Sequence, residues 1–313
     1  MLATVYNDRF EAVGRQRKKT KGYDGPDLGV ERIVTTMQQA LDEAELTSDD
    51  LIGIGIGCPS PIDMEAGIVL DAVNLGWKNL PLQKILAGEF SCPVTLLNDV
   101  DAGTYGEYRF GAAMGARTVL GVFPGTGIGG GCIYNGEVLH GAHSSCMEIG
   151  HIKVQRAGSL CGCGQRGCLE TEASRLAISA EVAKAAYRGK APYIMETAGT
   201  KLSDIRSSVL SSAIEAGDTA VEEIIQSAAR LIGLAIANFV HLLCPDVILL
   251  GGGLVEAMPE LFVSEVHKSV KRNTMPAFAK SFQTVAAELG DDATVLGAAG
   301  WIQKTVEAVP AST

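Results

Sequence analysis

One histidine and three cysteines near the middle of the chain have the spacing of metal ligands. They are His151, Cys161, Cys163 and Cys168, in the pattern H-x9-C-x-C-x4-C. Three thiolates and one imidazole fill the tetrahedral shell of a structural zinc ion, whereas the alternative is four unconnected reduced residues. Because no ligand position is left for water, we predict a Zn²⁺ ion that orders a loop and activates no substrate.

A second candidate site is the glycine-rich segment Gly125-Thr126-Gly127-Ile128-Gly129-Gly130-Gly131. It satisfies G-x-G-x-x-G, but a dinucleotide fingerprint requires a helix directly afterwards, and the next residues read as strand, Asn-Gly turn and strand. The segment instead resembles the phosphate-binding hairpins of sugar kinases and actin-like proteins, in which backbone N–H groups and a hydroxyl hold an anion. A P-loop is excluded, because no G-x-x-x-x-G-K-[ST] occurs.

Carboxylates near these segments could act on a substrate. Asn98-Asp99 ends a predicted strand, at the point where ligands usually bind in α/β proteins. A carboxylate there can accept a proton from a substrate hydroxyl, although an Asn-Asp pair is also a common helix cap. Glu148 precedes the predicted zinc loop and Glu170 follows it, so the ion would hold both carboxylates in place for a polyhydroxyl ligand. Taken singly, each glutamate could equally be a solvated surface residue.

Strands that alternate with helices must position these residues, and this order is typical of α/β layers. In the first half we predict a hairpin over residues 4–16, a helix from Pro26, strands at 51–57, 93–97 and 118–123, and a helix at 102–110. The second half is mostly helical, with a long helix at 218–243, a buried strand at 246–250 that runs into Gly251-Gly252-Gly253, and a helix at 258–270.

Composition limits the classes of protein. The 313 residues are 47% hydrophobic, and the net charge of −10 argues against a nucleic-acid partner. The first residues lack the features of a signal peptide, and the longest apolar run, 231–243, is shorter than the about 20 residues that span a bilayer. We therefore expect a cytoplasmic protein without a membrane partner. The 37 glycines are an excess that suggests close backbone contact with a ligand.

Together these motifs resemble the ROK family, whose name stands for repressors, open reading frames and sugar kinases. Glu148-x-Gly150-His151 and Cys161-x-Cys163-Gly164-x-x-Gly167-Cys168-x-Glu170 look like its two signature segments, in the right order and spacing. The likeness covers essentially the whole chain. It implies an actin-like or ribonuclease-H-like α/β ATPase fold with two lobes around a cleft. The small lobe would be residues 1–97 with the C-terminal helix at about 292–313, and the large lobe residues 98–291 with the zinc loop.

The resemblance also implies roles for individual residues. Asp99 would be the general base that deprotonates a sugar hydroxyl for attack on the γ-phosphate of ATP, supplied with Mg²⁺. The sugar would contact Asn74, Asn98, Asp99, Glu148, His151 and Glu170, with His151 also binding zinc. The nucleotide would contact Gly125, Thr126, Gly127, Gly251, Gly252, Gly253 and Gly297.

One family feature is absent from the sequence. The family's first motif is an Asp-x-Gly-Gly-Thr-Lys turn after the first strand, and Met1-Leu2-Ala3-Thr4 resembles the residues that follow that turn. Either the recorded start is too late in the reading frame, which we favour, or the chain is a truncated relative. A gap in a sheet leaves backbone groups unpaired, so we expect this 313-residue chain to be unstable and to transfer phosphate weakly or not at all.

The sequence thus predicts an ATP-dependent hexose kinase, with glucose as the leading substrate and a homodimer as the common assembly of such enzymes. Two alternatives stay open. One is a sugar-responsive transcription regulator of the same family, which would need a DNA-binding segment that nothing in the sequence resembles and which the acidic charge disfavours. The other is a sugar-binding remnant that has lost catalysis with the first phosphate motif.

Overall fold

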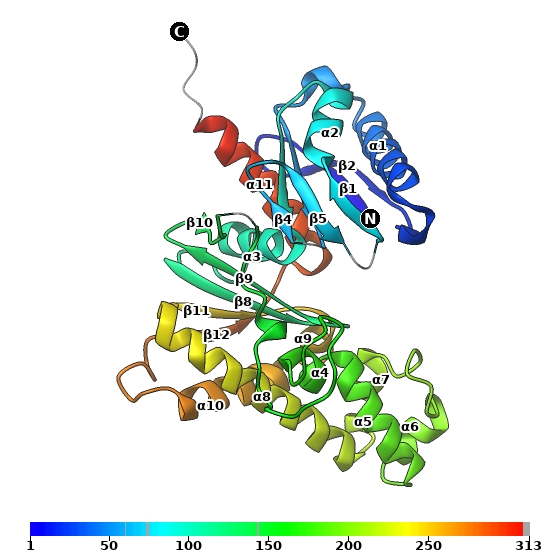
Figure 1. Cartoon of the computed structure of the whole chain (residues 1–313), viewed down its shortest axis with the longest axis vertical. Helices are drawn as coiled ribbons and strands as arrows, with labels where there is room; N and C mark the ends of the chain where they lie inside the picture. Colours follow the sequence, from blue (N-terminus) through cyan, green and yellow to red (C-terminus); the bar gives the residue numbers. More distant parts are fainter. Residues whose placement is uncertain (60, 73–74, 143, 309–313) are drawn as a thin grey trace. The chain divides into compact units, whose positions relative to one another are not determined.

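The chain forms two compact units in this structure, a computed structural model that describes residues 1–59, 61–72, 75–142 and 144–308 (Figure 1). Unit 1 comprises residues 1–114, 138–146 and the chain from Asp291 onward. Unit 2 comprises residues 115–137 and 147–290. The boundary therefore differs from the one predicted after residue 97. The physical reason is that helix α3 (Asp99–Phe110) packs against helix α11 (Ala293–Glu307), so it belongs to unit 1.

Unit 1 contains short sheets and four helices of at least nine residues in its described part. Its strands are β1 (Leu2–Tyr6), β2 (Ala12–Arg17), β3 (Ile54–Cys58), β4 (Ile62–Asp63), β5 (Ile68–Ala72), β6 (Trp77–Leu80) and β7 (Val94–Asn98). Its helices are α1 (Pro26–Glu43), α2 (Leu82–Phe90), α3 and α11, with short 3₁₀ turns at Gly22–Asp24 and Ser48–Asp50. The predicted hairpin and the helix that begins at Pro26 are both confirmed.

The strands of unit 1 form separate ladders. Antiparallel β1–β2 is one pair, parallel β3–β7 is another, and β4, β5 and β6 form a third sheet. Among the described residues, β1 and β3 each have one edge without a ladder partner, and both strands contact α11. All five residues of β1 are only half-buried, although the strand is apolar apart from Thr4 and the phenol of Tyr6. Among the described residues, each of the four strands in these two pairs thus has one open edge, β1 and β3 included.

Unit 2 is built on one sheet with strand order β10-β9-β8-β11-β12. The strands are β8 (Thr118–Pro124), β9 (Ile128–Tyr134), β10 (Glu137–Val138, which reaches the unit boundary), β11 (Val247–Leu250) and β12 (Gln283–Ala286). The helices are α4 (Leu169–Ala173), α5 (Arg175–Tyr187), α6 (Pro192–Thr197), α7 (Ser207–Glu215), α8 (Thr219–Leu243), α9 (Gly253–Ala257) and α10 (Pro259–Asn273), with 3₁₀ turns η3 (Ile149–His151) and η4 (Gly290–Asp292) at or near the boundary. The predicted strand, Asn135-Gly136 turn and strand are confirmed in β9 and β10.

The sheet of unit 2 places two glycine segments at one edge. Strand β11 runs parallel to β8, with Leu250 opposite Val122, and β9 returns antiparallel from the end of β8. All four residues of β11 are buried, as its continuous apolar sequence predicts. Because parallel strands end at the same edge, the turn after β8 and the glycines after β11 lie there together.

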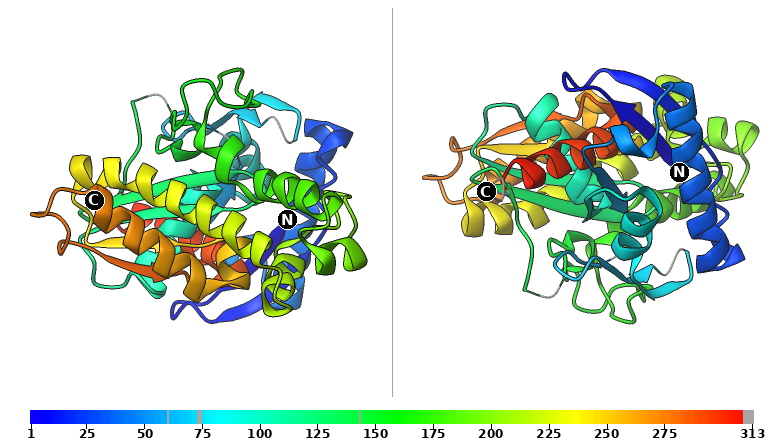
Figure 2. Two further views of the ribbon diagram at one scale, coloured as in Figure 1. Left: turned by 90° about the horizontal axis from the view of Figure 1, so that it is seen from below. Right: turned by 90° about the horizontal axis from the view of Figure 1, so that it is seen from above.

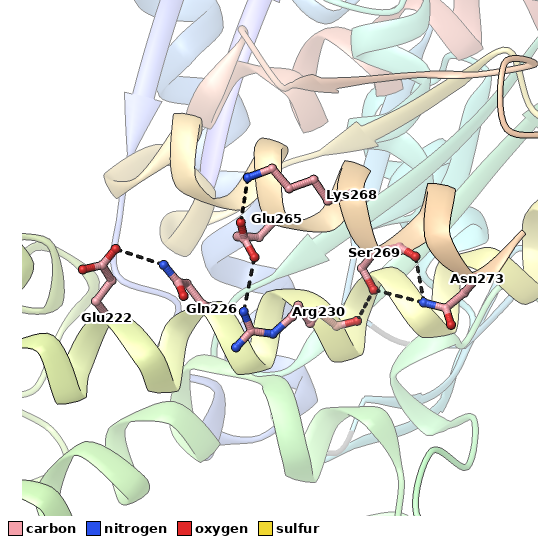
Figure 3. A network of polar contacts seen from close by, with 7 residues as sticks. All are labelled: Glu222, Gln226, Arg230, Glu265, Lys268, Ser269 and Asn273. Carbon is pink, nitrogen blue, oxygen red and sulfur yellow. Dashed lines mark hydrogen bonds and ion pairs between the residues drawn. The ribbon is translucent and has the colours of Figure 1, made fainter.

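Helices α8 and α10 run side by side in unit 2 (Figure 2). Arg230 Nη1 on α8 lies 3.4 Å from Glu265 Oε2 on α10, and Ser269 Oγ donates to the Arg230 carbonyl at 2.6 Å (Figure 3). Lys268 and Asn273 extend this network along α10, and Gln226 donates to Glu222 along α8. The ion pairs lie at the surface and contribute little energy, so the apolar faces beneath them supply most of the stability.

Helix α8 is long and apolar enough to cross a membrane by length and composition alone. In this structure it is a core helix, because ten of its residues are buried inside unit 2, among them Ile225, Ile232 and Val240. A helix that is buried on a wide face by neighbouring helices is the ordinary centre of a globular domain. Its apolar character is thus explained by packing.

Candidate functional site

The four predicted metal ligands lie together in unit 2. Turn η3 ends at His151, and the loop that follows brings Cys161 and Cys163 back to Cys168 at the start of α4. Cys161 Sγ lies 3.6 Å from His151 Nδ1, and Cys163 Sγ lies 3.7 Å from Cys168 Sγ. All four donor atoms are within 4.8 Å of one another. The spacing seen in the sequence therefore corresponds to one compact cluster.

The cluster fits a tetrahedral zinc ion. With Zn–S bonds of about 2.3 Å, the edge of a regular tetrahedron between two sulfurs is about 3.8 Å, close to the separations in the cluster. The loop is shaped for this by a β-bridge between Leu160 and Arg166, by the Cys161 N–H donated to the Gln165 carbonyl at 2.8 Å, and by Gly164 at φ +85°. Four protein donors leave no open position, so the arrangement suits a structural ion and not a catalytic one.

Removing one ligand is expected to destabilise this loop. We predict that Cys163→Ser lowers the zinc content from about one ion per chain to well below half, and lowers the melting temperature, because the metal joins η3 to α4. Cys163 is exposed, so its replacement removes a ligand with little change in packing. Elemental analysis and calorimetry measure both quantities. Cys244→Ser, at another exposed thiol of unit 2, is the control. Unchanged zinc content in Cys163→Ser would contradict the assignment.

The turn between β8 and β9, residues Gly125, Thr126 and Gly127, has the form of an anion-binding hairpin. Gly125 N–H donates to the Gly127 carbonyl at 2.8 Å, and Ile128 N–H donates to Glu170 Oε2 at 3.1 Å. In the described part of the chain, no protein acceptor is recorded for the N–H groups of Thr126 and Gly127. Two backbone donors and the Thr126 hydroxyl are thus available to a phosphate. The helix that a dinucleotide fingerprint requires is absent, since β9 follows directly.

This turn is contacted by the two segments that carry the metal ligands. A Cβ atom on Gly127 would overlap the carboxylate of Glu170, which lies two residues after Cys168. A Cβ atom on Gly150 would overlap the carbonyl of Ile128, and Gly150 immediately precedes His151. Glycine is therefore required at Gly150, where the neighbour is backbone, whereas at Gly127 a Cβ atom would have to displace the end of the Glu170 side chain. Both contacts explain part of the glycine excess.

Gly127→Ala tests the close approach. The new methyl group must displace the Glu170 carboxylate and break its hydrogen bond to Ile128 N–H, so we expect nucleotide binding to weaken about tenfold. Calorimetric titration with an ATP analogue measures this. Gly88→Ala is the matched control, because that helical glycine has open space around its Cβ position and alanine is the better helix former. Equal affinities in both variants would mean that the turn does not touch the nucleotide.

The second glycine segment begins a short helix at the same sheet edge. Gly251 N–H donates to the Val122 carbonyl at 3.1 Å, Gly252 has φ +82°, and Gly253 starts α9. Gly253 also lines a cavity of about 670 Å³ together with residues of α5, α7 and the loop before α7. The predicted phosphate turn and the predicted adenosine segment thus share one edge of unit 2.

Gly297 lies where two helices pack closely. It is a buried residue of α11 in unit 1, and a Cβ atom there would overlap the Ala102 carbonyl of α3. Gly106 makes the reciprocal approach from α3 to the Ala293 carbonyl. The structure explains Gly297 by the close packing of two helices; its predicted contact with the nucleotide stays a prediction.

Asn98 and Asp99 lie in unit 1, where β7 passes into α3. The Asn98 Oδ1 accepts the N–H groups of Val100 at 2.8 Å and Asp101 at 3.3 Å, so its side chain is the N-cap of α3. The Asn98-Asp99 pair therefore contains the helix cap that the sequence offered as an alternative to catalysis. The cap fixes the direction in which Asp99 follows strand β7. We therefore assign Asn98 a capping role; its predicted contact with sugar stays a prediction.

The Asp99 carboxyl has the environment of a general base. Burial raises its pKa above the ordinary aspartate value, and the hydrogen bond from Val100 N–H to Oδ1, at 3.0 Å, opposes part of that rise. Cys58 lies nearby, and burial, with the Asp99 charge, raises the pKa of its thiol to about 12, so the thiol stays neutral beside the carboxylate. A carboxylate with a raised pKa accepts a proton more readily than an exposed one.

The remaining predicted residues are placed as follows. Glu148 is exposed and precedes η3, and Glu170 is half-buried at the start of α4, so both lie in unit 2 with the metal ligands. Asn74 lies outside the described residues.

Arg175 also contacts the turn of residues 125–127, and the sequence analysis did not single it out. The feature that could have identified it is a positive charge at the start of a helix, where the helix dipole disfavours it.

Comparison with known proteins gives one consistent result. The family described as "ROK family" matches residues 2–305. A glucokinase of Halalkalibacterium halodurans is 34% identical over 298 residues, which are 95% of this chain and 89% of that protein. The DNA-binding transcriptional repressor Mlc of Escherichia coli is 31% identical over 281 residues, 86% of this chain and 65% of the repressor. A solved structure of a ROK family glucokinase from Streptomyces griseus, in complex with glucose and AMPPNP, superposes with a TM-score of 0.84 at 28% identity, covering 97% of this chain and 96% of that one.

Proposed function

The chain belongs to the ROK family and has its actin-like ATPase fold, and on this premise we propose that it is a sugar kinase that transfers the γ-phosphate of ATP to a hydroxyl of glucose. The observation that carries the proposal is Asp99, a half-buried carboxylate with a raised pKa at the carboxyl end of β7. Such a group can remove the proton of an attacking hydroxyl as the new O–P bond forms.

The nucleotide half of the proposal rests on unit 2. The open N–H groups of Thr126 and Gly127 suit phosphate oxygens, and the adjacent cavity of about 670 Å³ lies within the size range of small-molecule sites. The Streptomyces griseus relative was solved with AMPPNP, an ATP analogue. Phosphoryl transfer also needs its charge neutralised, so we include Mg²⁺ bound with the nucleotide.

The sugar half rests on the carboxylates and on the metal loop. We propose that Asp99, Glu148, His151 and Glu170 bind sugar hydroxyls, with Asn98 contributing from its capping position. The zinc ion, held by His151 and the three cysteines, would keep Glu170 and η3 in place, because the metal ligands are their immediate neighbours in the sequence. The metal supplies order to the loop, and the proton is moved by Asp99.

A hexose panel tests the proposal. The protein is assayed with ATP and Mg²⁺ against glucose, mannose, fructose, allose and N-acetylated hexosamines, with the ADP formed measured by a coupled reaction. We expect glucose to give the highest kcat/KM, because the relative with the greatest identity quoted above is a glucokinase. If another hexose has the highest kcat/KM, the proposed substrate is wrong but the proposed reaction still holds. No ADP formation above the sugar-free rate, even when the chain is extended as described in the Discussion, would overturn both.

A regulator of transcription is the second candidate, because the repressor Mlc is nearly as similar in sequence as the glucokinase. The kinase is favoured by Asp99, whose raised pKa suits the general base of a phosphoryl transfer. The net charge of −10 also suits DNA poorly. We further propose that the protein is cytoplasmic, where ATP is found, and that it is a homodimer, which size-exclusion chromatography with light scattering would test.

A further inference from the structure

Arg175 binds the turn of residues 125–127 through both its backbone and its side chain. Its N–H donates to the Gly125 carbonyl at 2.9 Å, and its Nη2 donates to Thr126 Oγ1 at 3.0 Å. The residue is half-buried and is the first of helix α5, whose N-cap is Ser174. A guanidinium at the positive end of a helix is electrostatically unfavourable, so its presence there calls for a compensating partner.

The contact decides what the Thr126 hydroxyl can do. A guanidinium has only donors, so in this pair the hydroxyl oxygen must accept. The single hydroxyl hydrogen is then free to point toward another acceptor, and the side chain is held in one rotamer. The N–H groups of Thr126 and Gly127 have no protein acceptor in the described part of the chain. The turn therefore offers a directed O–H beside two N–H groups, which is a set of donors for an anion.

The surroundings of Arg175 are also cationic. It lines the cavity of about 670 Å³ together with Leu176, Ser203, Arg206, Ser207 and Gly253, and none of the lining residues is acidic. Arg206 brings a second guanidinium, and it precedes α7, a helix of nine residues. The Asp204 carboxylate interacts electrostatically with Arg206 but does not line the cavity, so the two guanidinium groups that line it suit a ligand with negative charges.

We propose that Arg175 is a positioning residue for the nucleotide: it aims the Thr126 hydroxyl at a phosphate oxygen and places a positive charge beside the same phosphate. The inference rests on the proposed function insofar as the anion is taken to be the triphosphate of ATP. It concerns residues of unit 2 alone. It predicts that Arg175 and Thr126 act as one unit, so that replacing either one removes most of the benefit of the other.

A double-mutant cycle on nucleotide affinity tests this. AMPPNP with Mg²⁺ is titrated calorimetrically into the 313-residue protein and into Arg175→Met, Thr126→Val and the double variant. We expect Arg175→Met to raise the Kd about tenfold or more, as for the loss of a hydrogen bond to a charged group. In the Thr126→Val background the same replacement should change the Kd about twofold or less. Arg175→Lys keeps the positive charge but loses the planar guanidinium with its several donors. It should therefore bind AMPPNP more tightly than Arg175→Met and less tightly than the unaltered protein.

Two further measurements separate this role from a structural one. Arg188→Met, at the exposed far end of α5, is the matched control and should bind AMPPNP like the unaltered protein. Melting temperatures should agree among the variants, and in the kinase assay Arg175→Met should raise KM for ATP while KM for the hexose stays unchanged. Independent effects of Arg175→Met and Thr126→Val would overturn the inference. If AMPPNP binds with this coupling but no hexose is phosphorylated, even by the extended chain described in the Discussion, the inference stands and the proposed function fails.

Discussion

Asp99→Asn is expected to lower kcat for hexose phosphorylation about 10²- to 10⁴-fold, the usual effect of losing a general base. Asparagine has the shape of aspartate and keeps an oxygen for the Val100 N–H, but it cannot accept the hydroxyl proton. Sugar affinity, measured by calorimetry, should change far less than kcat. The assay uses the extended chain described below, so that the starting activity is high.

The pH dependence gives the same prediction a second readout. Only the ionised carboxylate can accept a proton, so the rate should fall on the acid side, at a pH above that of an ordinary aspartate because burial raises the pKa. Asp99→Asn should lack this fall in rate at low pH.

The raised pKa of Asp99 also affects stability. The folded protein binds this proton more tightly than the unfolded chain does, which favours folding at low pH. This contribution is lost as the pH rises through the pKa of the folded state. Asp99→Asn should therefore melt no lower than the parent at neutral pH.

Asp42→Asn is the control, since this exposed aspartate lies on the outer helix α1. It should leave kcat unchanged. Near-normal turnover in Asp99→Asn would show that another group removes the proton, and a fall in both variants would point to a general effect of charge.

The second large effect should come from extending the chain before Met1 with a β-strand that ends in Asp-x-Gly-Gly-Thr-Lys, a motif that the 313 residues do not contain. We expect phosphotransfer to rise from weak or absent to that of an active kinase, and the melting temperature to rise by several degrees. The reason lies in unit 1: β1 and β3 each have an unpaired edge, and both contact α11. An added strand between those edges would satisfy two rows of backbone donors and acceptors.

The control for this experiment is an extension of the same length and composition with the motif residues scrambled. If the two extensions give the same activity, the phosphate motif has no role. If the 313-residue chain already matches the extended one in turnover and melting temperature, the expected defect does not exist. Hydrogen exchange in β1 and β3 provides a direct measure, because pairing should protect amides that the open edges leave exposed.

Much of the fold could be predicted from the sequence, because its signals are local. The long apolar face of α8, the fully apolar β11 and the Pro26 start of α1 each appear in the structure within a few residues of their predicted bounds. The boundary between units was predicted less well, since it depends on which helix α3 packs against. That contact joins Ala102 to Gly297, nearly two hundred residues apart, and no local pattern encodes it.

What the sequence determined by itself was the chemistry that depends on spacing: the set of metal ligands at 151, 161, 163 and 168, the glycine turn at 125–127, and through them the family. Ligand spacing and the backbone freedom of glycine constrain residues that are near neighbours along the chain. Only the tertiary structure decided that Gly297 serves helix packing, that Asn98 caps α3, and that Arg175 holds Thr126. These roles depend on groups brought together by folding, and a residue's type does not reveal its partner.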